Sequence, residues 1–505
     1  MSLVPLPLLS TPRPGGSRPG EVIRISPDPV AEAAADLITK LYGTRTEITA
    51  EDPDLLFVRA PVDQPAPRGL DPLGQAEGYE LVTGEHGGVT VTAPTSAGLF
   101  RGATTYAQLL AEGVPGILVQ DAPAYAWRGL SLDVVRRFFP VEQVKRVIDL
   151  LALYKFNVLH LHLSDSQAWR LEIPGMPELT DPAHWPGDAG SRNGEGRQHY
   201  TVADYQELVR YAAERFVTVV PELDMPGHTQ AVLSAYPELG ERPHAILGHL
   251  DPARAMGFVE TVIAATPGRW LHLGGDEAFG MPHELYAVFM TEALARARKA
   301  GKQVVAWQEA ARSGSLLPQD VVQCWVGRGD EFDAEKMREQ VPEEYHPLLD
   351  VVAESFARSP QDTPDAVGQG AWILASPSSV LYLDRRYAEE STDPAQNGER
   401  PGMPAYAPRG CRELFDWMPG TLEEIPEGAR LAGVEAAVWC ESVKGFDDLA
   451  FLLLPRLSAI AEKAWTAGPT TWDDYRDRVG GHPGLWRALG WDAYFSSRDL
   501  FSSNA

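Results

Sequence analysis

The sequence predicts an α/β fold, in which a (β/α)8 TIM barrel is preceded by a small α/β domain. Eight short apolar runs recur along the chain, separated by segments long enough for a helix. Each run is continuously apolar, as expected for parallel strands buried on both faces, and ends in polar or aromatic residues. Eight strands that alternate with helices are typical of a closed barrel. The runs are residues 128–135, 157–165, 216–224, 269–277, 303–310, 321–327, 379–384 and 432–441.

The segment before the barrel combines strand and helix patterns. Residues 21–43 pair a β-type run with a helical pattern, and residues 78–94 hold two alternating runs around adjacent glycines, which indicates a hairpin. A helical pattern at 96–112 leads to DAPAYAWRG, where the pattern changes. The expected domains are a flexible leader (1–20), an N-terminal α/β domain (21–123), the barrel (124–475) and a C-terminal extension (476–505).

Composition excludes several classes of partner. The 44 Lys and Arg residues are outnumbered by 70 Asp and Glu residues, and this excess of acidic groups argues against a nucleic-acid or anionic-membrane surface. Three scattered cysteines, Cys324, Cys411 and Cys440, suggest neither a disulfide framework nor a zinc cluster. The first twenty residues lack a basic region and are interrupted by prolines, unlike a signal peptide or membrane anchor. We expect a cytoplasmic protein, or a secreted one if a signal has been removed.

The ends of the predicted strands carry the candidate site. In a (β/α)8 barrel the active site lies at the carboxyl ends of the strands. Indole rings beside carboxylates suit a sugar, because C–H faces stack on the rings while hydroxyls bind the carboxylates. Spacing therefore predicts one acidic, tryptophan-lined sugar pocket. The side chains expected to converge are Asp165, Asp224, Asp276, Glu277, Trp307, Trp325, Asp384 and Glu441.

Four ordered motifs resemble glycoside hydrolase family 20, the β-N-acetylhexosaminidases. The resemblance covers roughly residues 124–470, and the preceding segment is similar to the small α/β domain of that family. It implies an exo-acting enzyme that removes terminal N-acetylglucosamine or N-acetylgalactosamine from an oligosaccharide or glycoconjugate, without cofactor or metal. The motifs are WRGLSLDVVRRFF, LALYKFNVLHLHLSDSQAWR, VVPELDMPGH and LHLGGDEA.

The resemblance also explains why Asp276 and Glu277 are adjacent. Most glycosidases need two facing carboxylates, but this family is a substrate-assisted exception. The 2-acetamido oxygen of the substrate attacks its own anomeric carbon, and an oxazolinium forms. The resemblance implies that Glu277 is the acid/base, with a raised pKa, and that Asp276 stabilises the oxazolinium. Tyr382 would donate its hydroxyl to the acetamido oxygen.

Further roles follow from the same resemblance. Arg136 would bind the sugar's 3- and 4-hydroxyls with Asp165 as its ionic partner, and His228 would connect Asp165 to Glu277. Asp384 and Glu441 would bind the outer hydroxyls. The indoles expected to form the walls are Trp307, Trp325 and Trp439, with Trp417 closing one side.

The chain departs from the family pattern at Ser166, where a second Asp is usual, and at Met418, where an acidic residue is usual. Residues 229–269 are short for the family, whereas residues 327–370 form a long acidic connection. These segments border the leaving-group side. The departures therefore concern leaving-group preference rather than chemistry.

Other interpretations are open from the sequence. His160 and His162 are spaced as metal ligands can be and, with His228, His272 and Asp276, could form a metal-dependent barrel hydrolase; we interpret the first two as core residues. A non-catalytic sugar-binding protein is the alternative from another class. The presence of Glu277 favours an enzyme.

Overall fold

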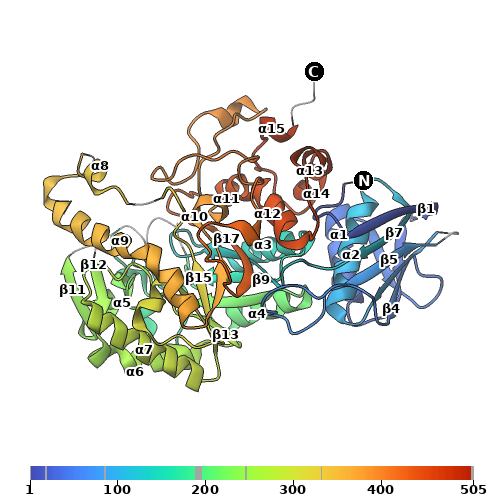
Figure 1. The fold of residues 1–505 in the computed structure, drawn as a ribbon. Coiled ribbons are helices and arrows are strands. Elements are labelled where there is room, and N and C mark those ends of the chain that lie inside the picture. The colour runs from blue at the N-terminus through green and yellow to red at the C-terminus, as the bar shows by residue number, and fades with distance from the viewer. Residues whose placement is uncertain are drawn as a thin grey trace.

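The computed structural model describes residues 2–17, 20–84, 87–187, 196–244, 247–330, 332–339 and 341–501. It contains a seven-stranded sheet near the N-terminus and a closed barrel of eight parallel strands (Figure 1). Both predicted parts of the fold are therefore confirmed. Among the described residues, no helix is both long enough and apolar enough to cross a membrane.

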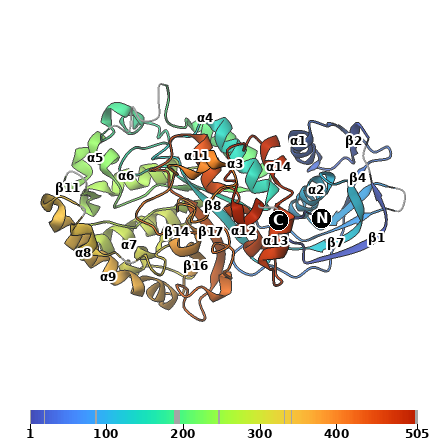
Figure 2. The ribbon, with the colours of Figure 1, turned by 90° about the horizontal axis from the view of Figure 1, so that it is seen from above.

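The N-terminal domain is a mixed sheet with helices packed on it. Helix α2 (Ser96–Leu110) contacts β5 and β6, and its N-cap Thr95 accepts a hydrogen bond from Gly98 N–H. Figures 1 and 2 place α2 on the side of the sheet that faces the barrel. The predicted hairpin is the antiparallel pair β5–β6. In sheet order the strands are β1 (Leu9–Ser17), β7 (Val114–Asp121), β5 (Tyr79–Thr83), β6 (Val89–Ala93), β4 (Leu55–Arg59), β2 (Val22–Ile25) and β3 (Arg45–Ile48).

The structure differs from the expected flexible leader. Strand β1 pairs with β7 along the edge of the sheet, although four of its residues are Pro or Gly. Leu3 and Val4 are buried, and the backbone of Val4 both donates to and accepts from the side chain of Gln108. Proline and glycine are tolerated here because an edge strand has one unbonded side. Residues 2–17 thus belong to the N-terminal domain.

The barrel strands coincide with the predicted runs except for the seventh. Strand β16 (Trp372–Ala375) pairs with β15 and β17, whereas run 379–384 begins inside helix α10 (Ser378–Leu381). That run is apolar because it packs over the barrel mouth, where Tyr382 bridges to Ala437 of β17. The other strands are β8 (Trp127–Asp133), β9 (Val158–His162), β10 (Thr218–Glu222), β13 (Trp270–His272), β14 (Gln303–Trp307), β15 (Val321–Cys324) and β17 (Leu431–Val438).

Helices surround the barrel and join it to the other domain. Figures 1 and 2 show α13 and α14 lying between the barrel and the N-terminal sheet. Trp486 of α14 is buried and donates to the hydroxyl of Tyr154 at 2.6 Å, so the C-terminal extension packs on the barrel. The helices are α1 (Ala31–Tyr42), α3 (Val141–Leu153), α4 (Val202–Glu214), α5 (Gln230–Ala235), α6 (Pro252–Ala265), α7 (His283–Lys299), α8 (Ala334–Arg338), α9 (His346–Gly368), α11 (Phe446–Leu453), α12 (Arg456–Trp465), α13 (Trp472–Val479), α14 (Pro483–Ala488) and α15 (Arg498–Phe501).

A buried ionic cluster fixes the barrel against the N-terminal domain. Glu77 accepts hydrogen bonds from Arg101 at 2.7 Å and from Arg128 of β8 at 2.6 Å, and all three side chains are buried. The two guanidinium groups lower the pKa of Glu77 although burial opposes them. The two parts of the chain therefore share a buried, ionised and hydrogen-bonded contact.

Candidate active site

A cavity of about 200 Å³ opens at the carboxyl ends of the barrel strands. It is lined by Arg136, His162, Asp165, His228, Asp276, Glu277, Trp307, Trp325, Tyr382, Asp384, Met403, Tyr406, Trp439 and Glu441. The structure thus brings together every predicted site residue except Trp417 and Asp224.

The adjacent carboxylates lie on a left-handed turn after β13. Gly274 and Gly275 have φ angles of +67° and +101°, and Glu277 itself has +47°. His228 has φ +52°, and its Nε2 lies 3.2 Å from Glu277 Oε2. Positive φ is costly for a residue with a side chain and concentrates at functional sites. The turn, rather than a strand, lets Asp276 and Glu277 both face one cavity.

Asp224 lies beneath this turn and explains the first of its two glycines. A Cβ on Gly274 would lie 1.6 Å from Asp224 Oδ1, and Gly275 N–H donates to the same oxygen at 3.1 Å. Burial, and then the Asp224 carboxylate, raise the pKa of Asp276 well above its usual value. Burial also raises the pKa of Asp224 to about 7. The two carboxyl groups therefore compete for a proton.

An ionic chain connects the base of the cavity to Glu277. Arg136 Nη2 lies 2.7 Å from Asp165 Oδ2, which is the ionic contact predicted from the sequence. His228 Nδ1 lies 3.0 Å from Asp165 Oδ1, and its Nε2 lies 3.5 Å from Asp276 Oδ2. Burial opposes protonation of His228, but the carboxylates of Asp165 and Asp276 raise its pKa well above the usual value. The cationic imidazole can therefore donate to Asp165 and towards Glu277.

Another buried carboxylate, that of Glu222, binds side chains next to this series of ionic contacts. Glu222 of β10 lies 2.5 Å from His162 Nδ1 and accepts from Trp307 Nε1 at 2.7 Å. His160 lies between Glu222, at 3.1 Å, and Glu435, at 2.9 Å. Burial alone would raise the pKa of Glu222, but the surrounding histidines hold it well below its usual range. Glu222 therefore holds in place the indole of Trp307, which forms one wall of the cavity, and the imidazole of His162.

Aromatic rings form the walls around the carboxylates. The ring centroid of Trp439 lies 6.0 Å from that of Trp307 and 6.0 Å from that of Tyr382. Tyr382 is 2% exposed, and burial raises its pKa well above the usual value, so its hydroxyl keeps its proton. Tyr406 packs edge-on against Tyr382 at 5.9 Å. The walls offer apolar faces and the neutral hydroxyls of two tyrosines, Tyr382 and Tyr406.

The far side of the cavity carries charged groups suited to hydroxyls. Arg136 Nη1 lies 3.6 Å from Glu441 Oε1, and its guanidinium lies over the ring of Trp439 at 5.5 Å. Neither carboxylate oxygen of Asp384 has hydrogen-bond geometry with any residue that the structure describes. Burial, and then Glu441, raise the pKa of Asp384 to about 8. A hydroxyl-bearing ligand would satisfy these buried oxygens.

Comparison with known proteins identifies the family. Residues 125–468 match the catalytic domain of glycosyl hydrolase family 20, and residues 1–122 match domain 2 of that family. The chain belongs to glycosyl hydrolase family 20. A β-N-acetylhexosaminidase from Cellulomonas fimi is 36% identical over 496 residues, which cover 93% of this chain and 90% of that protein.

Solved structures of family 20 enzymes resemble the whole chain. The GH20 β-N-acetylhexosaminidase from Streptomyces coelicolor A3(2) has a TM-score of 0.80 and 32% identity, with 99% of each chain covered. A mutant Streptomyces plicatus β-hexosaminidase in complex with its product GlcNAc has a TM-score of 0.80 and 31% identity, covering 99% of this chain and 98% of that one. This family 20 protein is a glycoside hydrolase.

Trp417 is one of the two predicted site residues that do not line the cavity of this hydrolase. Its indole packs in the core, and its Nε1 donates to Leu414 O at 2.9 Å. Tyr406 and Met403, from the loop after α10, line the cavity but were not predicted. The loop itself carries no strand or helix pattern that would place it at the barrel mouth. His162 was expected in the core, yet its Nε2 reaches the cavity wall and lies 2.7 Å from Asp165 Oδ2.

The histidines that would bind a metal if the protein were a metal-dependent hydrolase lie next to carboxylates. Both nitrogens of His160 lie against carboxylates, which raise its pKa to about 9 against the effect of burial. The pKa of His228 is raised as well, whereas burial lowers that of His272. Two groups of described residues have the ligand types of a metal site, His160–Glu222–His272 and Asp224–His228–Asp276.

Proposed function

We propose that this family 20 hydrolase is an exo-acting β-N-acetylhexosaminidase that uses retaining, substrate-assisted catalysis. The observation that carries the proposal is the placement of Asp276, Glu277 and Tyr382 on one small cavity. Asp276 is the deeper carboxylate, with a side chain 13% exposed, and Glu277 is nearer the opening at 27%. A deep carboxylate suits the acetamido group, and an outer one suits the leaving oxygen.

The proposed reaction has two steps. In the first, the acetamido oxygen of the substrate bonds to its anomeric carbon while the glycosidic C–O bond breaks and Glu277 protonates the departing oxygen. Asp276 accepts the acetamido N–H and stabilises the positive oxazolinium, and Tyr382 donates to the acetamido oxygen. In the second step, Glu277 removes a proton from water, which opens the oxazolinium. Two inversions at the anomeric carbon give net retention.

His228 and the charged far wall complete the proposal. The cationic His228 lies 3.2 Å from Glu277 Oε2 and orients that carboxyl group. Arg136, Asp384 and Glu441 bind the outer hydroxyls of a single sugar, which suits a terminal, non-reducing residue. The Streptomyces plicatus relative binds GlcNAc, so we propose an N-acetylhexosamine-containing oligosaccharide or glycoconjugate as substrate.

The 2-acetamido group should be required for turnover. We expect kcat/KM on an aryl N-acetyl-β-glucosaminide to exceed that on the matching aryl β-glucoside by about 10³-fold or more, because the glucoside lacks the internal nucleophile. A stable thiazoline mimic of the oxazolinium should inhibit competitively. Comparable kcat/KM on the two glycosides would refute the substrate-assisted mechanism.

Replacing Asp224 by Asn should shift the pH dependence. Catalysis needs the Asp276 carboxylate, so activity is lost as pH falls through its raised pKa. The Asp224 charge contributes to that raised pKa, whereas the asparagine that replaces it keeps an acceptor oxygen for Gly275 N–H. The acid limb of the kcat/KM profile should therefore move to lower pH in Asp224→Asn. An unchanged or upward-shifted limb in a folded variant would show that Asp224 does not tune Asp276.

A further inference from the structure

A second, apolar groove adjoins the sugar cavity. It has a volume of about 450 Å³, which lies in the range of ligand sites, and runs between β12 (Leu247–Leu250) and the N-terminal half of α9. Leu247, Phe279, Leu348 and Val352 line it and are each partly exposed. Partly exposed aliphatic and aromatic side chains that gather around one hollow are typical of a binding surface.

The groove meets the sugar cavity at the proposed acid. Glu277 and His228 line both spaces. If Glu277 protonates the glycosidic oxygen, the first atoms of the leaving group must lie beside its carboxylate. The leaving group then extends from the sugar cavity into a space that borders Glu277.

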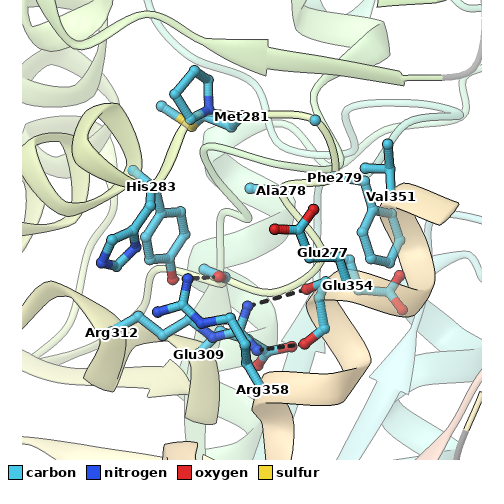
Figure 3. Close-up of a pocket in the computed structure, with 15 residues that line it drawn as sticks. Glu277, Ala278, Phe279, Met281, His283, Glu309, Arg312, Val351, Glu354 and Arg358 are labelled. Atoms are coloured by element: carbon cyan, nitrogen blue, oxygen red, sulfur yellow. Dashed lines mark hydrogen bonds between the residues drawn. The ribbon is translucent and has the colours of Figure 1, made fainter.

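A polar cavity of about 380 Å³ also borders Glu277, and Phe279 lines both this cavity and the groove (Figure 3). Its walls carry Glu309, Arg312 and Arg358, and it does not include His228. Figure 3 shows Arg312 held to α9 by hydrogen bonds, and Arg312 is also paired with Asp362. The apolar groove shares two residues with the sugar cavity, whereas the polar cavity shares one. The geometry therefore favours the groove as the path of the leaving group.

The polar content of the groove is low. Apart from the two residues shared with the sugar cavity, Ser166 and Tyr345 bring the only side-chain hydroxyls among its described lining residues. A sugar in this position would leave most of its hydroxyls against hydrocarbon, where a lost hydrogen bond is costly. An alkyl or aryl group would instead remove apolar surface from water.

We propose that the groove binds the leaving group and that the enzyme prefers N-acetyl-β-hexosaminides with an apolar alkyl or aryl aglycone over those linked to a second sugar. This inference rests on the proposed function. Helix α9 provides the specificity, because Leu348 and Val352 lie one turn apart on the same face. Val351, the neighbouring residue, instead lines the polar cavity (Figure 3).

Alkyl glycosides of different length test the groove. Methyl and hexyl N-acetyl-β-glucosaminides release alcohols of nearly equal acidity, so a difference in kcat/KM reports contact with the chain rather than leaving-group chemistry. One fully buried methylene corresponds to about a fourfold effect, and with partial burial we expect the hexyl glycoside to be about 10- to 100-fold better. It should also exceed N,N′-diacetylchitobiose in kcat/KM. Equal values for methyl and hexyl, or a preference for the disaccharide, would overturn the inference.

Matched variants locate the contact. The double variant Leu348→Ser/Val352→Ser should lower the hexyl-to-methyl ratio at least about fivefold, whereas Val351→Ser should keep it. If a thermal unfolding measurement shows that the double variant is not folded, Val352→Thr, which is nearly isosteric with the wild type, tests the same contact. If the hexyl-to-methyl ratio of kcat/KM fell only in Val351→Ser, the leaving group would lie in the polar cavity and the proposal for the groove would be refuted. If the proposed function itself fails, the aryl N-acetylglucosaminide is not hydrolysed either, which separates the two failures.

Discussion

Replacing Asp276 by Asn is expected to lower kcat by about 10²- to 10³-fold and to change KM by less than about threefold. The carboxylate faces positive charge that develops mainly in the transition state, so its loss raises the barrier more than it weakens ground-state binding. An Asn side chain keeps the size of Asp276 and an acceptor oxygen but removes the charge. Steady-state kinetics on an aryl N-acetyl-β-glucosaminide measure both constants.

Asp224→Asn is the matched control for this variant. Asp224 is a buried carboxyl group that lies beneath the turn carrying Asp276, but it does not line the cavity. Its replacement should leave kcat at the pH optimum within about threefold of the wild-type value. A change confined to KM in Asp276→Asn would mean that Asp276 binds substrate without stabilising the oxazolinium.

The barrel was predictable because buried parallel strands carry their own pattern. Strands β8, β9, β10, β13, β14, β15 and β17 each overlap one of the predicted apolar runs. The seventh strand was missed although WILA is entirely apolar, because the run assigned instead, SVLYLD, is also largely apolar and packs over the barrel mouth. Strand β1 was missed for a related reason: its prolines and glycines carry turn signals, and only pairing with β7 makes it a strand.

The candidate site was predictable where a residue stands at a strand end. Tyr382 lines the cavity although the run that contains it is not a strand. Its role was predicted from the resemblance to the family, which does not depend on the secondary structure of the run. Tyr406 comes from an irregular loop, for which the sequence offers no periodicity. Trp417 has the residue type of a sugar platform, but its indole is committed to Leu414 and the core. Residue type alone does not show whether an aromatic side chain lines the cavity or packs in the core.

The geometry of the turn could not be predicted from spacing. Two residues with side chains, His228 and Glu277, adopt positive φ and face each other across 3.2 Å. Their conformations depend on long-range contacts, among them Asp224 beneath Gly274 and Asp165 beside His228. The sequence shows the two glycines, but not the carboxylate that makes the first of them necessary.

The largest loss of activity is expected for Glu277→Gln, measured on a substrate whose leaving group needs a proton. Removing a general acid typically costs about 10²- to 10⁴-fold in rate, so hydrolysis of a disaccharide, which releases a poor alcohol leaving group, should fall by this amount. A dinitrophenyl leaving group is already stable as an anion. The first step on that substrate should therefore stay comparatively fast, and the defect should lie in the attack of water. Pre-steady-state release of dinitrophenolate, followed by a slow steady state, would report this change.

Azide separates the acid role from the base role of Glu277. Azide needs no general base, so it should attack the accumulated oxazolinium in Glu277→Gln, restore turnover of the dinitrophenyl substrate and give the β-glycosyl azide. The β configuration of that product also reports double inversion, because attack on the oxazolinium comes from the face that the leaving group vacated. Asp276→Asn is the matched comparison: its slow step is formation of the oxazolinium, so azide should not restore its rate. Equal losses on both substrates with no azide rescue, in a variant that keeps the wild-type thermal transition, would mean that Glu277 is not the acid/base and that the turn after β13 serves another purpose.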